Sequence, residues 1–288
     1  MTRWLRGATL AVALILLGAG CGGIQLREQD LFLPKPSLTP ADFPHQGLTL
    51  TRHTIPAADT ALGLDAWQLT KPGAERHVLF FGGNGFYLVQ SRGYVDALAR
   101  HPVQQWLVDY RGYGRSGGEP AVEALKADAL QVYDYLVDTR GVAPQHLYVH
   151  GHSMGTFLAL HVAESRPVRG VVLENPASSG PAWTKAVLPW YLRVLLRPKL
   201  PAEIAEEDNL SRIAQLDAPV LIIAGSADPI TPPSMAEALY EAAPQDKREL
   251  LIVEGGGHNE LYDDPAYIAT YAGWWARWIE PDASTEGP

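Results

Sequence analysis

The sequence contains almost no cysteine and fewer basic than acidic residues. Cys21 is the only cysteine among 288 residues, so neither an intramolecular disulfide nor a cysteine-based metal site can form. Lysine and arginine number 23 against 32 aspartates and glutamates, giving a formal net charge of −9. Because nucleic-acid binding needs clustered cations, this balance argues against a nucleic-acid partner. The remaining composition, 47% hydrophobic and 19% charged, suits one α/β domain or at most two small ones.

The first 26 residues have the pattern of an export signal. Arg3 and Arg6 precede an apolar run, and small residues then lead into Cys21. LLGAGC resembles the bacterial lipobox, in which the signal is removed just before a cysteine that carries lipid. We therefore expect a signal peptide over 1–20 and a lipid-anchored tether over 21–47, with Cys21 as the lipidated residue.

Two other interpretations of this segment stay open. Gly7 to Leu26 carries no charge and is about long enough to span a bilayer as an uncleaved anchor. An ordinary signal peptide with an incidental cysteine is the second. All three interpretations place the domain outside the cytoplasm. The lipoprotein that we expect is attached to a membrane of the cell envelope and faces the periplasm or the exterior. The residue after Cys21 is Gly22 and not an acidic residue. In this the sequence resembles lipoproteins that are sorted to the outer membrane.

Beyond residue 47, short apolar runs alternate with amphipathic stretches of helical length. Continuous apolar runs are expected where helices cover both faces of a parallel sheet, and their alternation with helices predicts a doubly wound α/β domain over 48–280. The tail 281–288 is polar and is predicted to be disordered. The expected strands are 48–55, 62–69, 77–81, 105–109, 146–150, 170–174, 220–224 and 249–253.

One segment, 176–217, interrupts the alternation. It inserts about forty residues between two strands, and connections of that length usually carry function. We expect a small helical cap over the ligand-binding edge of the sheet, the alternative being a surface crossover that only packs on the domain. Four side chains of this segment are candidates to line an apolar pocket: Trp183, Trp190, Tyr191 and Leu195.

Two stretches match the nucleophile pattern GxSxG: GRSGG around Ser116 and GHSMG around Ser153. Ser153 lies between the expected strand 146–150 and a helical run, and its flanking glycines suit a tight strand-to-helix turn. Ser116 follows a glycine-rich loop without a strand directly before it. The sequence therefore favours Ser153 as the nucleophile.

A serine nucleophile needs a base, and the base needs an orienting acid. His258 follows three glycines after the expected strand 249–253, at the same sheet edge as Ser153. Asp228 is expected to end the strand that begins at Val220, and Pro229 after it stops the strand and exposes the carboxylate at the same sheet edge. Glu174, which ends the strand before it, remains the alternative acid.

Acyl transfer also needs hydrogen-bond donors aimed at the oxyanion. The backbone N–H of Met154, at the start of the helix after Ser153, is one candidate. The loop FFGGNG provides the other, the N–H of Asn84. This loop lacks the lysine of a phosphate loop and the GxGxxG spacing, so nucleotide binding is not expected.

The region from Leu48 to Ile279 resembles the α/β-hydrolase superfamily. FFGGNG, DYRGYGRSGGEP, GHSMG, ADPITPP and GGGHNE are similar to the motifs of its small, membrane-attached serine hydrolases, whose oxyanion loop commonly reads HGN. Gly82 departs from that pattern, since histidine is frequent there. The resemblance implies an eight-stranded sheet, catalytic Ser153, Asp228 and His258, and no cofactor or metal.

The function implied is hydrolysis of carboxylic esters or related acyl bonds of a small-molecule substrate through an acyl-enzyme. Peptidase or aminopeptidase activity and acylglycerol lipase activity are alternatives within the same chemistry. A non-catalytic envelope protein that uses the fold for binding is the alternative from another class. A complete set of serine, aspartate and histidine argues against this last interpretation.

Overall fold

The computed structural model describes most of the chain beyond the leader. No helix in the described part combines the length and the apolar character needed to cross a bilayer. The expected signal peptide, Cys21 and the C-terminal tail lie outside it. The described residues are 27–34, 47–59, 61–86, 88, 91–187 and 199–279.

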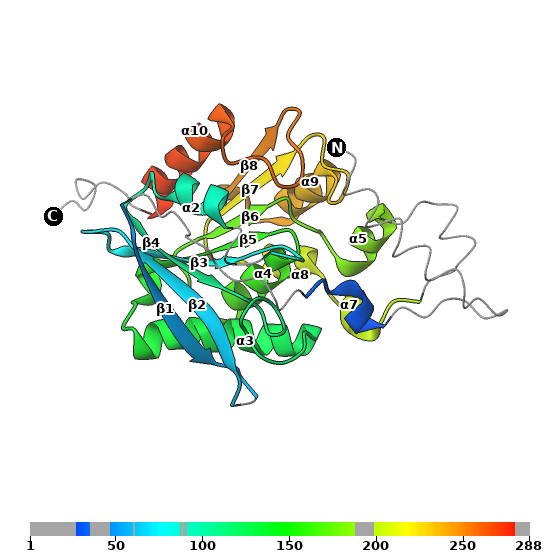
Figure 1. Cartoon of the computed structure of the whole chain (residues 1–288). Helices are drawn as coiled ribbons and strands as arrows, with labels where there is room; N and C mark the ends of the chain where they lie inside the picture. Colours follow the sequence, from blue (N-terminus) through cyan, green and yellow to red (C-terminus); the bar gives the residue numbers. More distant parts are fainter. Residues whose placement is uncertain are drawn as a thin grey trace.

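An eight-stranded sheet forms the centre of the molecule (Figure 1). Its strand order is β1-β2-β4-β3-β5-β6-β7-β8; β2 runs antiparallel to both neighbours, and the other neighbouring pairs are parallel. The α/β-hydrolase fold expected from the sequence is thus confirmed. The strands are β1 Thr49–Pro56, β2 Gly63–Thr70, β3 Arg76–Phe81, β4 Val103–Val108, β5 Leu147–His152, β6 Val171–Glu174, β7 Val220–Gly225 and β8 Arg248–Val253.

The central strands are apolar throughout because both of their faces are buried. In β7, Ile222 and Ala224 belong to one hydrophobic core, while Leu221 and Ile223 belong to a second core on the opposite face. Successive side chains of a strand point to opposite faces, so two covered faces require an uninterrupted apolar run. This explains why continuous runs located these strands to within about two residues.

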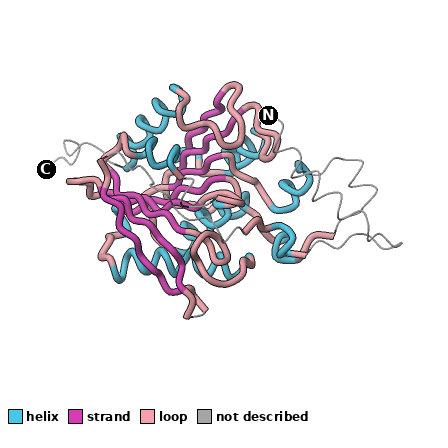
Figure 2. Tube along the Cα trace, in the orientation of Figure 1, coloured by secondary structure: helices cyan, strands magenta, loops and turns pink. Residues whose placement is uncertain are grey.

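Helices cover the two faces of the sheet in separate groups (Figure 2). Apolar residues of α3, α4, α8 and α9 pack into the first core, and those of α2, α10 and the turn η6 pack into the second. The helices are α2 Arg92–Leu98, α3 Val122–Asp134, α4 Gly155–Ser165, α5 Gly180–Val187, α7 Ala202–Ala205, α8 Asn209–Ala214, α9 Pro233–Ala242 and α10 Pro265–Trp274. Single turns are η1 Glu28–Leu31, η3 Tyr135–Thr139, η4 Pro144–His146, η5 Gln245–Lys247 and η6 Trp275–Ile279.

The insertion 176–217 contains α5, α7 and α8 among its described residues. Trp183 lies on α5, whereas Trp190, Tyr191 and Leu195 fall outside the described part of the chain. The tether expected over 21–47 includes the turn η1, which packs against the domain: Phe32 is a member of the first core.

Candidate active site

Ser153 occupies a strained turn between β5 and α4. Its φ of 52° lies in the left-handed region that residues with a side chain seldom adopt. A Cβ on Gly151 would lie 2.5 Å from the carbonyl oxygen of Gly155, and one on Gly155 would lie 2.0 Å from that of Phe81. Both glycines are therefore required by close backbone approach, and the turn projects the serine from the end of β5.

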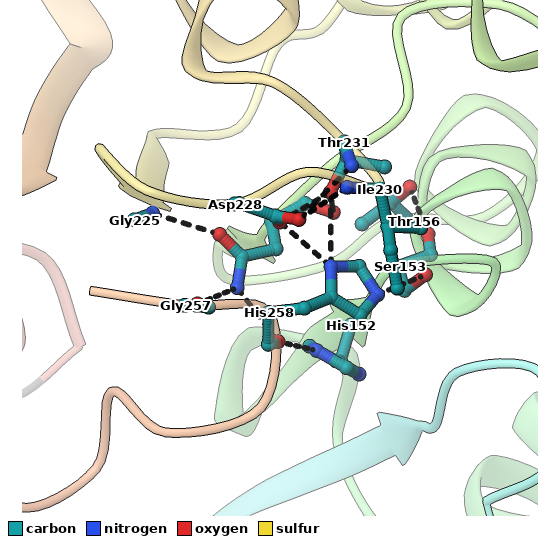
Figure 3. Close-up of polar contacts among 10 residues, drawn as sticks. His152, Ser153, Thr156, Gly225, Asp228, Ile230, Thr231, Gly257 and His258 are labelled. Atoms are coloured by element: carbon teal, nitrogen blue, oxygen red, sulfur yellow. Dashed lines mark hydrogen bonds and ion pairs between the residues drawn. The ribbon is translucent and has the colours of Figure 1, made fainter. Parts of the chain in front are cut away.

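The structure brings Ser153, His258 and Asp228 into one hydrogen-bonded chain (Figure 3). His258 Nε2 lies 2.9 Å from Ser153 Oγ, and His258 Nδ1 lies 2.6 Å from Asp228 Oδ2. Because the carboxylate accepts the Nδ1–H, Nε2 is left as the acceptor for the serine hydroxyl. A neutral imidazole in this tautomer can take the serine proton.

The carboxylate of Asp228 lies in a loop beyond β7, which ends at Gly225, so the expectation that Asp228 ends the strand was wrong by three residues. A Cβ on Gly225 would lie 2.2 Å from the carbonyl oxygen of Gly256, where the two loops touch. The loop turns the carboxylate toward His258. Asp228 Oδ1 accepts from the backbone N–H groups of Ile230 and Thr231 at 2.8 and 3.1 Å.

The environment of Asp228 keeps it ionised. Burial by itself would raise its pKa, but hydrogen bonds from His258 and Thr231 and the charge of His258 outweigh this and lower the pKa below its ordinary value. Thr231 donates its hydroxyl to Asp228 Oδ2 at 2.7 Å. A permanent carboxylate at this place stabilises a protonated His258.

Glu174, the alternative acid, faces away from His258. Its side chain is fully buried at the end of β6, 3.3 Å from His150 Nε2, and it accepts a hydrogen bond of 3.2 Å from the hydroxyl of Tyr267. Burial would raise its pKa, yet the contact with His150 and nearby charges lower it. The geometry places Asp228, and not Glu174, beside the histidine.

Two further residues hold the histidine loop, and the sequence did not single them out for this. Asn175 Nδ2 donates to the carbonyl oxygens of Gly257 and His258 at 3.2 and 2.8 Å, and its Oδ1 accepts from Gly225 N–H at 2.9 Å. His152 Nε2 lies 2.8 Å from the carbonyl oxygen of His258. The Asn-Pro pair directly after β6 was the available signal, since that dipeptide marks turns.

The two residues whose backbone N–H groups were expected to bind the oxyanion lie near the serine. Asn84 and Met154 line the same pocket as Ser153, and neither N–H donates a backbone hydrogen bond within the described chain. The loop of Asn84 runs close to the serine, since a Cβ on Gly83 would lie 3.2 Å from Ser153 Cβ. Free donors beside a nucleophile can stabilise a developing negative charge.

Ser116 has a different environment. Its hydroxyl donates to the carbonyl oxygen of Asp109 at 2.6 Å and accepts from the N–H of Asp65 at 2.8 Å. Both partners are backbone groups, so the hydroxyl connects the GRSGG loop to β2 and to the end of β4. This serine has a structural role.

An apolar pocket opens beside Ser153. Its empty space amounts to about 720 Å³ when the solvent at its open side is included, and its lining is mainly apolar. Trp183 contributes to its lining, as expected. The described lining residues are Leu31, Phe32, Asn84, Val122, Leu125, Lys126, Ser153, Met154, Phe157, Leu158, Gly180, Trp183, Ile204 and Glu207.

The strand order and the strained strand-to-helix turn after β5 define an α/β hydrolase. Residues 73–213 and 205–265 match the family described as serine aminopeptidase, S33. This chain belongs to that family, and it is a hydrolase by fold and descent.

Similar proteins span most of this chain. An uncharacterized protein of Mycobacterium tuberculosis is 30% identical over 258 residues, covering 88% of this chain and 89% of its own. Alpha/beta hydrolase domain-containing protein 17B of Xenopus laevis is 31% identical over 191 residues, 66% of this chain and 62% of its own. The structure of the Pyrococcus furiosus esterase Pf2001 superposes with a TM-score of 0.68 at 17% identity, covering 86% of this chain and 98% of the esterase.

Proposed function

We propose that this protein is a serine hydrolase that cleaves carboxylic esters with an apolar acyl group. The observation that supports this most directly is the hydrogen-bonded chain from Asp228 through His258 to Ser153. The 2.9 Å between His258 Nε2 and Ser153 Oγ is a distance at which a base can remove a serine proton, and the 2.6 Å contact with Asp228 orients that base.

The reaction follows from these positions. His258 Nε2 takes the proton of Ser153 as Oγ attacks the ester carbonyl carbon, and the N–H groups of Asn84 and Met154 stabilise the resulting oxyanion. The intermediate collapses, the carbon–oxygen bond to the alcohol breaks, and His258 donates its proton to the departing alkoxide. Water then attacks the acyl-serine with His258 as base, which releases the acid and restores the serine.

The pocket favours an apolar acyl group over the charged amine that an aminopeptidase would bind. Glu207 is the one carboxylate among the described lining residues. Its two oxygens already face cations, with Lys126 Nζ at 3.3 Å and Arg212 at 2.6 Å. A substrate ammonium would have to compete with both, whereas the remaining lining is mainly hydrocarbon.

A substrate panel tests this proposal. We expect the protein to hydrolyse p-nitrophenyl esters of aliphatic acids with a kcat/KM at least about tenfold above that for aminoacyl p-nitroanilides, because no unpaired carboxylate occurs among the described lining residues. Preference for the anilides would favour the peptidase alternative. Absence of turnover on every ester, amide and thioester would favour a binding protein.

We also propose that the protein is exported and attached to a membrane by a lipid on Cys21. The support is the sequence alone: two arginines, an apolar run and the lipobox-like LLGAGC. Mass analysis of the mature N-terminus is the test. An N-terminal diacylated Cys21 is expected, and a chain that still begins at Met1 would contradict it.

A further inference from the structure

A segment N-terminal to the hydrolase domain forms part of the pocket beside Ser153. Leu31 and Phe32 line the pocket together with Ser153 and Ile204, although they precede the first strand. Figure 1 shows η1 beside α7, which lies about 170 residues further along the chain. Phe32 is only 7% exposed, so its ring is enclosed by the domain.

The side chain of Asn84 holds this segment at two points. Asn84 Nδ2 donates to the carbonyl oxygen of Leu31 at 2.6 Å, and Asn84 Oδ1 accepts from the N–H of Leu33 at 3.1 Å. The hydroxyl of Tyr113 donates to the same Oδ1 at 2.8 Å. One carboxamide thus pairs with a backbone acceptor and a backbone donor two residues apart, which fixes the register of the segment.

A third contact lies at the start of α3. The N-cap residue of this helix, Ala121, has no side-chain hydrogen bond to offer, and Glu28 supplies the missing acceptor by binding the N–H of Val122. A carboxylate at a helix N-terminus also interacts favourably with the helix dipole. Three contacts, two from Asn84 and one from the start of α3, therefore hold the segment in place.

We propose that Leu31 and Phe32 of the segment 28–33 are a wall of the acyl pocket and that Phe32 selects which acyl groups fit. This inference rests on the proposed ester hydrolysis. The ring of Phe32 fills space that a longer or bulkier acyl group would need. Because Asn84 belongs to the loop proposed to bind the oxyanion, the contacts that hold the wall also restrain that loop.

Three substitutions in the full-length chain test this wall. Phe32→Ala enlarges the pocket and Phe32→Trp reduces it, so they should move selectivity in opposite directions. Leu33→Ala is the matched control, because Leu33 belongs to the same segment, is 56% exposed and does not appear among the lining residues. The readout is the ratio of kcat/KM for p-nitrophenyl dodecanoate to that for the acetate.

We expect Phe32→Ala to raise this ratio by about tenfold or more, because the fit of even one methylene changes selectivity by that much. Phe32→Trp should lower it, and Leu33→Ala should stay within about twofold of the parent protein. Equal ratios in the parent and both Phe32 variants would overturn the inference. If Phe32→Ala fails to fold, an unchanged ratio in Phe32→Trp alone would overturn it.

A binding measurement separates this inference from the proposed function. Dodecanoate binding, measured by calorimetry, does not require turnover, and Phe32→Ala should strengthen it while Leu33→Ala should leave it unchanged. If no ester is hydrolysed but this difference appears, the proposed function fails and the wall stands. If esters are hydrolysed and Phe32→Ala binds dodecanoate like the parent protein, the wall fails.

Discussion

The loops GRSGG and GHSMG match the same five-residue pattern, and their serines are equally buried, each 7% exposed. They differ in where the backbone strain lies. In GRSGG the left-handed residues are Gly114 and Gly118, with φ of 52° and 84°, whereas in GHSMG Ser153 itself has a φ of 52°. They also differ in partners, since Ser116 binds backbone groups and Ser153 meets a histidine. A candidate nucleophile is therefore distinguished by backbone strain at the serine itself and by an imidazole within hydrogen-bond distance. The GxSxG pattern alone does not distinguish it.

The largest expected effect concerns Asp228, the acid that binds the histidine beside the GHSMG loop. Asp228→Asn removes the acceptor for His258 Nδ1–H and should lower kcat/KM for an ester by about 10⁴-fold, the size seen when such an aspartate is neutralised. Glu174→Gln is the matched control, since Glu174 does not contact His258, and its loss should be less than about tenfold. The reverse ranking in steady-state kinetics would assign the acid role to Glu174.

A second prediction contrasts the glycines of the two loops. Gly155→Ala would place a methyl group 2.0 Å from the carbonyl oxygen of Phe81, which is backbone, so we expect a loss of about 3 to 5 kcal/mol in the free energy of unfolding. In Gly117→Ala the new methyl group would lie 3.3 Å from the flexible side chain of Leu62, so the free energy of unfolding should change by less than about 1 kcal/mol. Urea denaturation measures both. Equal losses of unfolding free energy in the two variants would show that the two loops do not differ in how closely the backbone packs around their glycines.

A third prediction concerns the carboxyl group of Asp109, which lies next to Gly114 of the GRSGG loop. Burial raises the pKa of Asp109 to about 7, whereas the pKa of Asp228 is lowered. Between the ordinary aspartate pKa and about 7 the folded state keeps a proton on Asp109 that the unfolded state releases, so stability should fall as pH rises through this window.

Asp109→Asn should remove this dependence. Between pH 5 and 8 the parent protein should lose about 1 to 3 kcal/mol relative to the variant, measured by urea denaturation at several pH values. Parallel stability curves for the two proteins would show that Asp109 has an ordinary pKa.

The smallest expected effect is that of Ser116→Ala. Removing the hydroxyl leaves the N–H of Asp65 and the carbonyl oxygen of Asp109 without this partner, so unfolding should become easier by about 1 to 2 kcal/mol. Turnover per folded molecule should stay within about twofold. Thermal unfolding and an ester assay check the two halves. A large loss of turnover in well-folded protein would give Ser116 a role in the reaction.

Local patterns were enough to predict the fold. The strands appeared as apolar runs because both sheet faces are covered, and β4, which begins at Val103 and not at 105, shows the usual size of the error. The chain order of Ser153, Asp228 and His258 also followed from their positions after strands. Glycines around the serine carried a local signal that the structure explains by close approach.

Contacts between distant segments could not be predicted in this way. Asn175 donates to two carbonyl groups that lie 82 and 83 positions further along the sequence, and Asn84 donates to Leu31 across 53 positions. His152 contacts the carbonyl oxygen of His258 across 106 positions. Such contacts depend on how the loops approach one another, which periodicity and turn signals do not encode.

Covalent labelling of the two serines tests the central claim most directly. The parent protein, Ser116→Ala and Ser153→Ala are each incubated with a fluorophosphonate, and the modified peptide is identified by mass spectrometry. The account predicts one phosphonylated residue, Ser153, in the parent and in Ser116→Ala, and no label in a folded Ser153→Ala. Undiminished labelling of Ser153→Ala, or a label on Ser116 in the parent protein, would contradict it.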